Sequence, residues 1–248
     1  QTPSEKPNSY GVTTMKKSIC AAMLAATLSA APAANATDFD VTITNLTNGI
    51  YFTPFLVAAH PAGTTLFATG QPASANLQAM AEGGDISGLE ADVNGLGATV
   101  VANPAGGLLG PTGSTTFNMN TDGTSNDRLS AVAMLLPTND AFAGLNAIEI
   151  PTEPGTYTFD VPAYDAGTEA NDEILNGGGM PGTPGMPADP GGLAGTGATG
   201  AAAADVNPNV HIHRGSLGDT DAAAGTSDLD SRVHRWLNPV IRVTVTVN

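Results

Sequence analysis

Four acidic residues lie within nine positions in the stretch PAYDAGTEANDE, residues 162–173: Asp165, Glu169, Asp172 and Glu173. Like charges this close repel one another unless something neutralises them. Asp165 and Glu169 flank Ala-Gly-Thr, and a turn that contains glycine would let both carboxylates face one point. Calcium takes six to eight oxygen ligands, which acidic loops can supply. The spacing is therefore compatible with a calcium site, although each acid alone is equally typical of a solvated turn.

A further acid, Asp140, follows the apolar run of residues 131–136 at a Pro-Thr-Asn-Asp turn. Taken alone, it is typical of an ordinary turn residue. The alternative for Asp165 and Glu169 is a general acid and base of an exported hydrolase. We expect no enzyme, because the sequence has no Gly-x-Ser-x-Gly elbow and no His-Glu-x-x-His helix.

His211 and His213 would share one face of a strand, since side chains alternate along it. Two such histidines can begin a zinc site, which His60 or His234 could complete. No partner is fixed by spacing, so hydrogen-bonded or surface histidines are the simpler interpretation, and the role of the pair stays open.

The N-terminal residues have the order of a secretory signal peptide. Met15 is followed by the basic pair Lys16-Lys17 and then by an apolar run, and the small-residue site Ala-Asn-Ala ends at Ala36. We expect residues 1–14 to be upstream sequence translated by a misplaced start, residues 15–36 to be a Sec-type signal peptide cleaved after Ala36, and residues 37–248 to be the mature domain. The protein would then be secreted or periplasmic.

The mature chain is strongly acidic. Without residues 1–36, which hold Glu5 and all three lysines, it keeps 22 of 23 acids and five of eight basic residues, a formal charge of −17. This charge argues against nucleic acid and anionic membranes as partners. It fits a cation-rich exterior, or it only keeps an exported protein soluble. No later segment is apolar enough to span a membrane.

The elements that would position the acids are short strands. Residues 39–45 and 241–247 alternate between apolar and polar side chains, and Asn48-Gly49 between two apolar runs predicts a hairpin. Further strands are predicted at the sequence stretches STTFNM, LSAVAMLLP, NAIEI and GTYTFDV, with one helix over residues 74–80. The pattern predicts an all-β fold, an antiparallel β-sandwich with long loops. Residues 177–204, almost free of charge and rich in Gly, Pro and Ala, predict a disordered, flexible insertion within it.

The succession NDRLSAVAMLLPTNDAFAGL, PGTYTFDVPAYDAGTEANDE, VHIHRG and WLNPVIRVTVTV resembles the spondin N-terminal domain family in its shorter bacterial form, from about Asp38 to Val247. The resemblance implies a C2-like calcium-binding β-sandwich of secreted matrix and adhesion proteins. It implies Asp140, Asp165 and Glu169 as ligands of Ca²⁺, with Glu169 where animal members carry Asp.

Two functions follow from the resemblance and the composition. The first is a secreted, calcium-binding, non-enzymatic adhesion or binding module of the cell exterior, whose partner is an unknown extracellular protein or glycan. The second is a structural protein of the envelope or extracellular matrix, in which the insertion and the acidic surface serve spacing and solubility.

Overall fold

The alternating strands near the two ends of the described residues pair with each other. The structure is a computed structural model that describes residues 37–202 and 207–248. In it, β1 and β11 run antiparallel from Phe39 opposite Val247 to Asn45 opposite Ile241. They form the centre of a four-stranded sheet in the order β5-β1-β11-β8. Its strands are β1 (Asp38–Asn45), β5 (Ser114–Asn120), β8 (Gly155–Val161) and β11 (Ile241–Val247).

A second antiparallel sheet has the order β10-β9-β7-β6-β3-β4, and β2 also pairs with β6. Its strands are β2 (Tyr51–Phe52), β3 (Leu56–Pro61), β4 (Thr99–Ala102), β6 (Asn126–Leu136), β7 (Ala141–Glu149), β9 (Ala163–Asp165) and β10 (His211–Ile212). The main core lies between the two sheets, where Phe39, Val41 and Ile43 of β1 and Val243 and Val245 of β11 are fully buried. The predicted antiparallel β-sandwich is confirmed.

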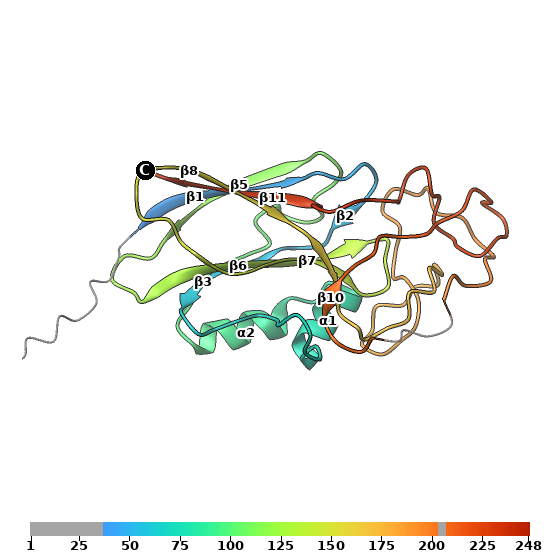
Figure 1. The fold of residues 1–248 in the computed structure, drawn as a ribbon, viewed down its shortest axis with the longest axis horizontal. Helices are drawn as coiled ribbons and strands as arrows, with labels where there is room; N and C mark the ends of the chain where they lie inside the picture. The colour runs from blue at the N-terminus through green and yellow to red at the C-terminus, as the bar shows by residue number, and fades with distance from the viewer. Residues whose placement is uncertain (1–36, 203–206) are drawn as a thin grey trace, which may run out of the picture. The chain divides into compact units, whose positions relative to one another are not determined.

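Two helices cover the outer face of the second sheet (Figure 1). They are α1 (Ala75–Gly83) and α2 (Ser87–Gly95). The Ser74 hydroxyl accepts a hydrogen bond from the Leu77 N–H, which caps the first turn of α1. Leu77 and Met80 of α1 pack with Leu56 and Met134 of the sheet in a second apolar cluster. The predicted helix is therefore confirmed, whereas α2 was not predicted.

The predicted hairpin at Asn48-Gly49 is wrong. A turn is present, but β1 pairs with β5 and β11, whereas β2 pairs with β6 in the other sheet. Both edges of β1 are occupied by β5 and β11, so the chain crosses to the other sheet, and the turn is held by the side chain of Asn45. Its Nδ2 donates to the carbonyls of Ile50 (2.8 Å) and Leu109 (3.2 Å), and its Oδ1 accepts from the Thr47 N–H (2.9 Å).

The prediction of a disordered insertion over residues 177–204 needs a correction. Residues 177–202 contain no helix or strand, as expected of a loop, but they follow a defined path in which Met186 is fully buried. The N–H groups of Gly182 and Gly185 donate to the buried carboxylates of Glu82 and Glu169. The composition of the insertion gave no sign of these contacts. Residues 203 and 204, like the signal peptide predicted at 15–36 and residues 1–14, lie outside the described residues.

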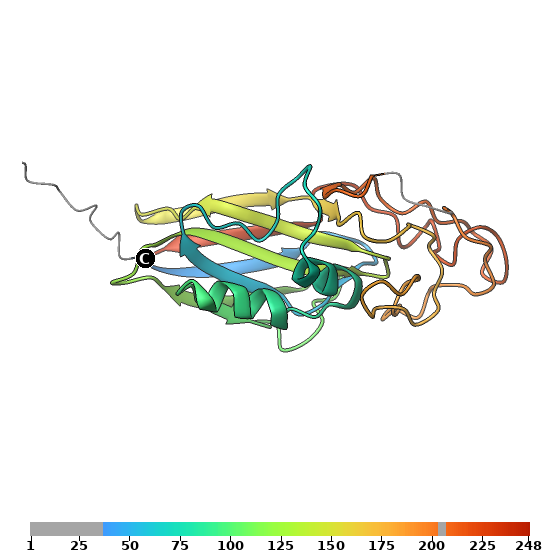
Figure 2. The ribbon, with the colours of Figure 1, turned by 90° about the horizontal axis from the view of Figure 1, so that it is seen from below.

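The long connections gather at one end of the sandwich. Both views show the orange-to-red loops between β9 and β11 at the end away from the C-terminus (Figures 1 and 2). In the described ranges, no helix is long and apolar enough to cross a bilayer. The predicted acidic ligands lie in and beside these loops.

We expect Asn45→Ala to lower the free energy of unfolding by about 2 to 3 kcal/mol. Asn45 is buried, and truncation removes its hydrogen bonds and leaves the Thr47 N–H without its acceptor. Urea denaturation would measure the loss. The matched control is Asn118→Ala, because this exposed side chain bonds only at the surface, mainly to Asp38 and Asp40, and should cost less than about 1 kcal/mol. Equal losses in both variants would contradict a special role for Asn45.

Candidate functional site

Sheet pairing brings Asp140 and Asp165 together. Ala141, the first residue of β7, lies opposite Asp165, the last residue of β9. The Ala166 N–H donates to the backbone carbonyl of Asp140 (3.3 Å), which fixes the two turns against each other. Both carboxylates are almost completely buried. Two acids that lie 25 positions apart in the sequence thus become neighbours.

Asp140 is held by the loop that follows β9. Its Oδ2 accepts hydrogen bonds from the backbone N–H groups of Thr168 (2.9 Å) and Glu169 (3.2 Å). Its Oδ1 is buried and has no hydrogen-bond partner in the described part of the chain. Burial, and next the charge of Asp165, raise the pKa of Asp140 to about 8. Without a compensating positive charge, Asp140 therefore retains a proton near neutral pH.

Asp165 lies among polar groups from the same loop and from β10. Its Oδ1 accepts from the Gly167 N–H (2.8 Å) and its Oδ2 from the Asn171 side-chain amide (2.7 Å). The Nε2 atoms of His211 and His213 lie 3.8 and 3.9 Å from that same Oδ2. Asp165 is thus the point where β9, β10 and the loop after β9 meet.

Glu169 faces the insertion. Its Oε1 accepts from the side-chain amide of Asn139 (2.8 Å) and from the Gly185 N–H in a short contact. Its Oε2 is buried and, within the described ranges, has no hydrogen-bond partner. Burial raises the pKa of Glu169 to about 7, and the charges of Glu82 and Asp172 add to the rise. Glu169 is therefore positioned by contacts that differ from those of Asp165.

Asn139 connects the acids, and this role was not predicted. Its Nδ2 donates to Glu169 and to the Asp172 carboxylate (2.8 Å each), and its Oδ1 accepts from the Glu173 N–H (3.2 Å). Glu173 binds a different loop, because its carboxylate accepts from the N–H groups of Leu217 and Gly218. The only signal for Asn139 was its place beside Asp140 in the turn.

Among the described residues, the histidines are not gathered with other His, Cys, Asp or Glu side chains into a group of three that could hold zinc. His213 Nδ1 accepts from the Gly215 N–H (2.9 Å), so a neutral ring carries its proton on Nε2, which faces Asn171 Oδ1 (3.1 Å). His60 bonds to Ser130 (2.8 Å), and His234 Nδ1 accepts from the Asp230 N–H (3.0 Å). The buried His234 Nε2 has no hydrogen-bond partner in the described part of the chain and lies 3.8 Å from an oxygen of Asp189. His60 and His213 are hydrogen-bonded, as in the simpler interpretation.

The residues fit a hard cation in part. Asp140 Oδ1 and Glu169 Oε2 are buried carboxylate oxygens without partners, which is costly unless a cation or water binds there. However, among residues 37–202 and 207–248 no three His, Cys, Asp or Glu side chains are arranged around one point as metal ligands. Backbone carbonyl or amide oxygens would have to complete a calcium site.

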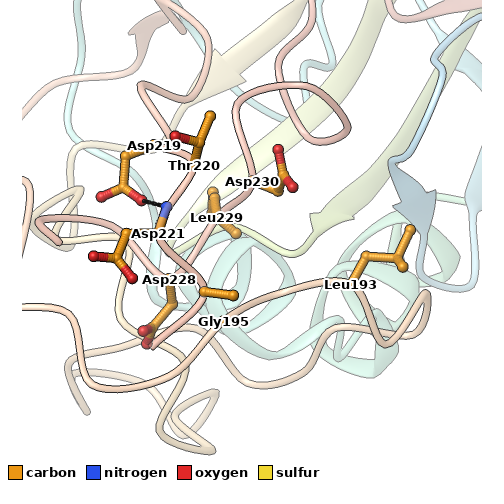
Figure 3. Close-up of a pocket in the computed structure, with 9 residues that line it drawn as sticks. Leu193, Gly195, Asp219, Thr220, Asp221, Asp228, Leu229 and Asp230 are labelled. Carbon is orange, nitrogen blue, oxygen red and sulfur yellow. Dashed lines mark hydrogen bonds between the residues drawn. The ribbon is translucent and has the colours of Figure 1, made fainter. Parts of the chain in front are cut away.

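A second group of acids lies at the far side of the loops (Figure 3). Asp219, Asp221, Asp228 and Asp230 line a cavity of about 10 Å³, which is room for about one water molecule. The Asp219 carboxylate accepts from the N–H groups of Asp221, Thr226 and Ser227, and these bonds lower its pKa. The group therefore acts as a set of turn acceptors.

The comparison with known families agrees with the order of motifs in the sequence. The family model described as Spondin_N matches residues 36–173, just over half of the chain. The match includes Asp140, Asp165 and Glu169, and it ends before the insertion. No curated protein matches the sequence.

We expect the stability of the metal-free protein to fall as pH rises from 5.5 to 9. Folded Asp140 binds a proton that the unfolded carboxyl, with its ordinary pKa of 3.8, has released, so this contribution is full below pH 3.8 and lost as pH passes about 8. One such group changes the free energy of unfolding by up to about 1.4 kcal/mol per pH unit. Urea denaturation in chelator at several pH values would measure this dependence. In Asp140→Asn the free energy of unfolding should fall less steeply with pH, and the remaining dependence should come from Glu169.

The control for this prediction is Asp160→Asn. Asp160 is exposed, and its pKa is lowered by Arg242, so it stays ionised in both states over this pH range. It should leave the slope unchanged. A slope in Asp140→Asn equal to that of the parent protein would show that Asp140 is not the titrating group.

Proposed function

The chain belongs to the Spondin_N family, and from this premise we propose that it is a secreted, calcium-binding, non-enzymatic module that meets a partner outside the cell. The family consists of extracellular, non-catalytic domains of the binding type. Calcium, adhesion and export are the proposed part. Export is supported by the signal-peptide pattern of residues 15–36.

The observation that carries the proposal is the state of Asp140. A fully buried carboxylate with one oxygen unpartnered, beside a second buried acid, is unfavourable by itself. A divalent cation would remove the repulsion between Asp140 and Asp165 and supply the missing partner of Oδ1. We propose these two as ligands together with Glu169, whose Oε2 also lacks a partner. The bound ion would supply positive charge that ties the turn before β7 to the loop after β9.

The geometry supports the two alternatives, a hydrolase and a structural matrix protein, less well. In a hydrolase, Asp165 and Glu169 would have to exchange protons with a substrate, but both carboxylates accept hydrogen bonds from protein groups. For a matrix protein, the insertion was expected to act as a spacer. Residues 177–202 instead pack back against α1 and Glu169, which favours a compact module that presents its loops to a partner.

We expect calcium to raise the midpoint of thermal unfolding. Calcium at 100 times its dissociation constant would add about 2.7 kcal/mol, or roughly 5 to 10 °C for a domain of this size. Asp165→Ala and Asp140→Asn should abolish the shift relative to chelator, since each removes a proposed ligand. Scanning calorimetry with calcium and with chelator would measure it.

The matched control is Asp122→Asn, an exposed acid in the turn between β5 and β6, which should keep the full shift. Absence of any calcium effect on the parent protein would overturn the metal assignment. A full shift in Asp140→Asn would place the ion at other residues.

A further inference from the structure

Two buried glutamates hold the middle of the insertion. Glu82, in the last turn of α1, accepts from the Gly182 N–H at 2.6 Å, and Glu169 accepts from the Gly185 N–H. Glu82 is fully buried and Glu169 is 8% exposed. Carboxylates that accept backbone N–H bonds form stronger bonds than neutral acceptors. Residues 178–186, here called the clasp, are thus held at two points by the buried carboxyl groups of Glu82 and Glu169.

Both carboxylates are oriented by other side chains of the domain. The Gln78 amide donates to Glu82 Oε1 (2.8 Å) across one turn of α1, and the Asn139 amide donates to Glu169 Oε1. One oxygen of each carboxylate is therefore positioned independently of the clasp. The clasp docks onto acceptors that the rest of the fold places.

The clasp also has an apolar anchor and a reason for its glycines. Met186 is fully buried, and its N–H donates to the Ile174 carbonyl (2.8 Å). A side chain on Gly83 would collide with the Gly179 carbonyl, so glycine lets the clasp lie directly on the end of α1. Gly185 has a φ of +108° and would collide with Asn176 if it carried a Cβ. The glycines here allow close packing as well as chain freedom.

From these contacts we propose that the clasp caps the cation site and that its docking is coupled to cation binding through Glu169, with Glu82 as a positioning residue. Glu169 Oε1 receives the clasp, and Oε2 is left for the ion. One rotamer of Glu169 serves both, so whichever binds first orders the side chain for the other. Coupling of this kind is reciprocal: calcium stabilises the docked clasp, and the docked clasp raises calcium affinity by the same factor. This inference rests on the proposed function, since it needs an ion at that site.

Hydrogen exchange of the full chain, read by mass spectrometry with calcium or with chelator, tests the coupling. We expect exchange in peptides that cover the clasp to slow by roughly 5- to 150-fold with calcium, the usual range of such coupling. Peptides from α2 are the internal reference, because α2 has no contact with the proposed ligands. Equal slowing in both regions would mean global stabilisation alone and would overturn the proposal.

The matched variants are Glu82→Leu and Glu82→Gln. Leucine removes the acceptor of the Gly182 N–H, whereas glutamine retains a carbonyl acceptor, and both leave the proposed ligands in place. Calorimetric titration should show calcium binding weakened roughly tenfold by leucine and little changed by glutamine. If Glu82→Leu does not fold, Met186→Ala loosens the clasp at its anchor and should weaken calcium binding in the same way.

The two readouts separate this inference from the function on which it rests. Calcium binding to the parent protein with unchanged exchange in the clasp would overturn the coupling and leave the calcium module intact. Absence of calcium binding would overturn both. Equal calcium affinity in the parent, Glu82→Leu and Met186→Ala would likewise contradict the reciprocal effect.

Discussion

Hydrogen bonds from backbone N–H groups to carboxylates hold the loop end of this protein together. Between β9 and β11 the chain forms almost no regular structure among the described residues, so its N–H groups cannot be satisfied by sheet pairing. Acidic side chains take over that role. Glu173 accepts from two N–H groups, and Asp189 and Asp219 from three each. The acidic side chains of this segment thus have an architectural use besides solubility.

This role separates the acids into two kinds. Asp219 and Asp228 are surrounded by N–H donors, and Asp228 is buried with both oxygens satisfied, by Leu175 and Ala198. Asp140 and Glu169 differ because each has one satisfied oxygen and one buried oxygen without a partner. Burial raises the pKa of Asp140 and of Glu169, whereas hydrogen bonds from backbone N–H groups lower the pKa of Asp219. The unpartnered oxygens of Asp140 and Glu169 give an ion a physical reason to bind at the second kind.

The sequence predicted what depends on local pattern. Alternation located β1 and β11, and the helix predicted over residues 74–80 corresponds to α1. The Asn48-Gly49 signal located a turn but not the strands that it joins, because both edges of β1 pair with strands distant in the sequence, β5 and β11. Helix α2 was missed because its glycines weaken the pattern, although Leu89 and Val93 have helical spacing and are buried.

The candidate site was predicted in its acids but not in what orients them. The sequence drew attention to Asp140, Asp165 and Glu169, and only the resemblance implied that they are ligands. Asn139 and Glu82 carry no signature, since an asparagine in a turn and a glutamate in a helix are ordinary. Their importance comes from burial, which no local pattern reveals. The same limit made the insertion look unable to order, because its partners are supplied by Glu82 of α1 and by Glu169 of the loop after β9.

The fold explains why the loop end can be irregular and still be held in place. The family match ends at residue 173, yet β11 lies beyond it and pairs with both β1 and β8. The chain leaves the second sheet at β9 and returns through β10 to finish in the centre of the first. The segment between β9 and β11 is therefore anchored at both ends by strands. The entropic cost of closing such a loop grows only slowly with its length. The carboxylates of Glu82, Glu169 and Glu173 then fix the path of this segment through hydrogen bonds to its backbone N–H groups.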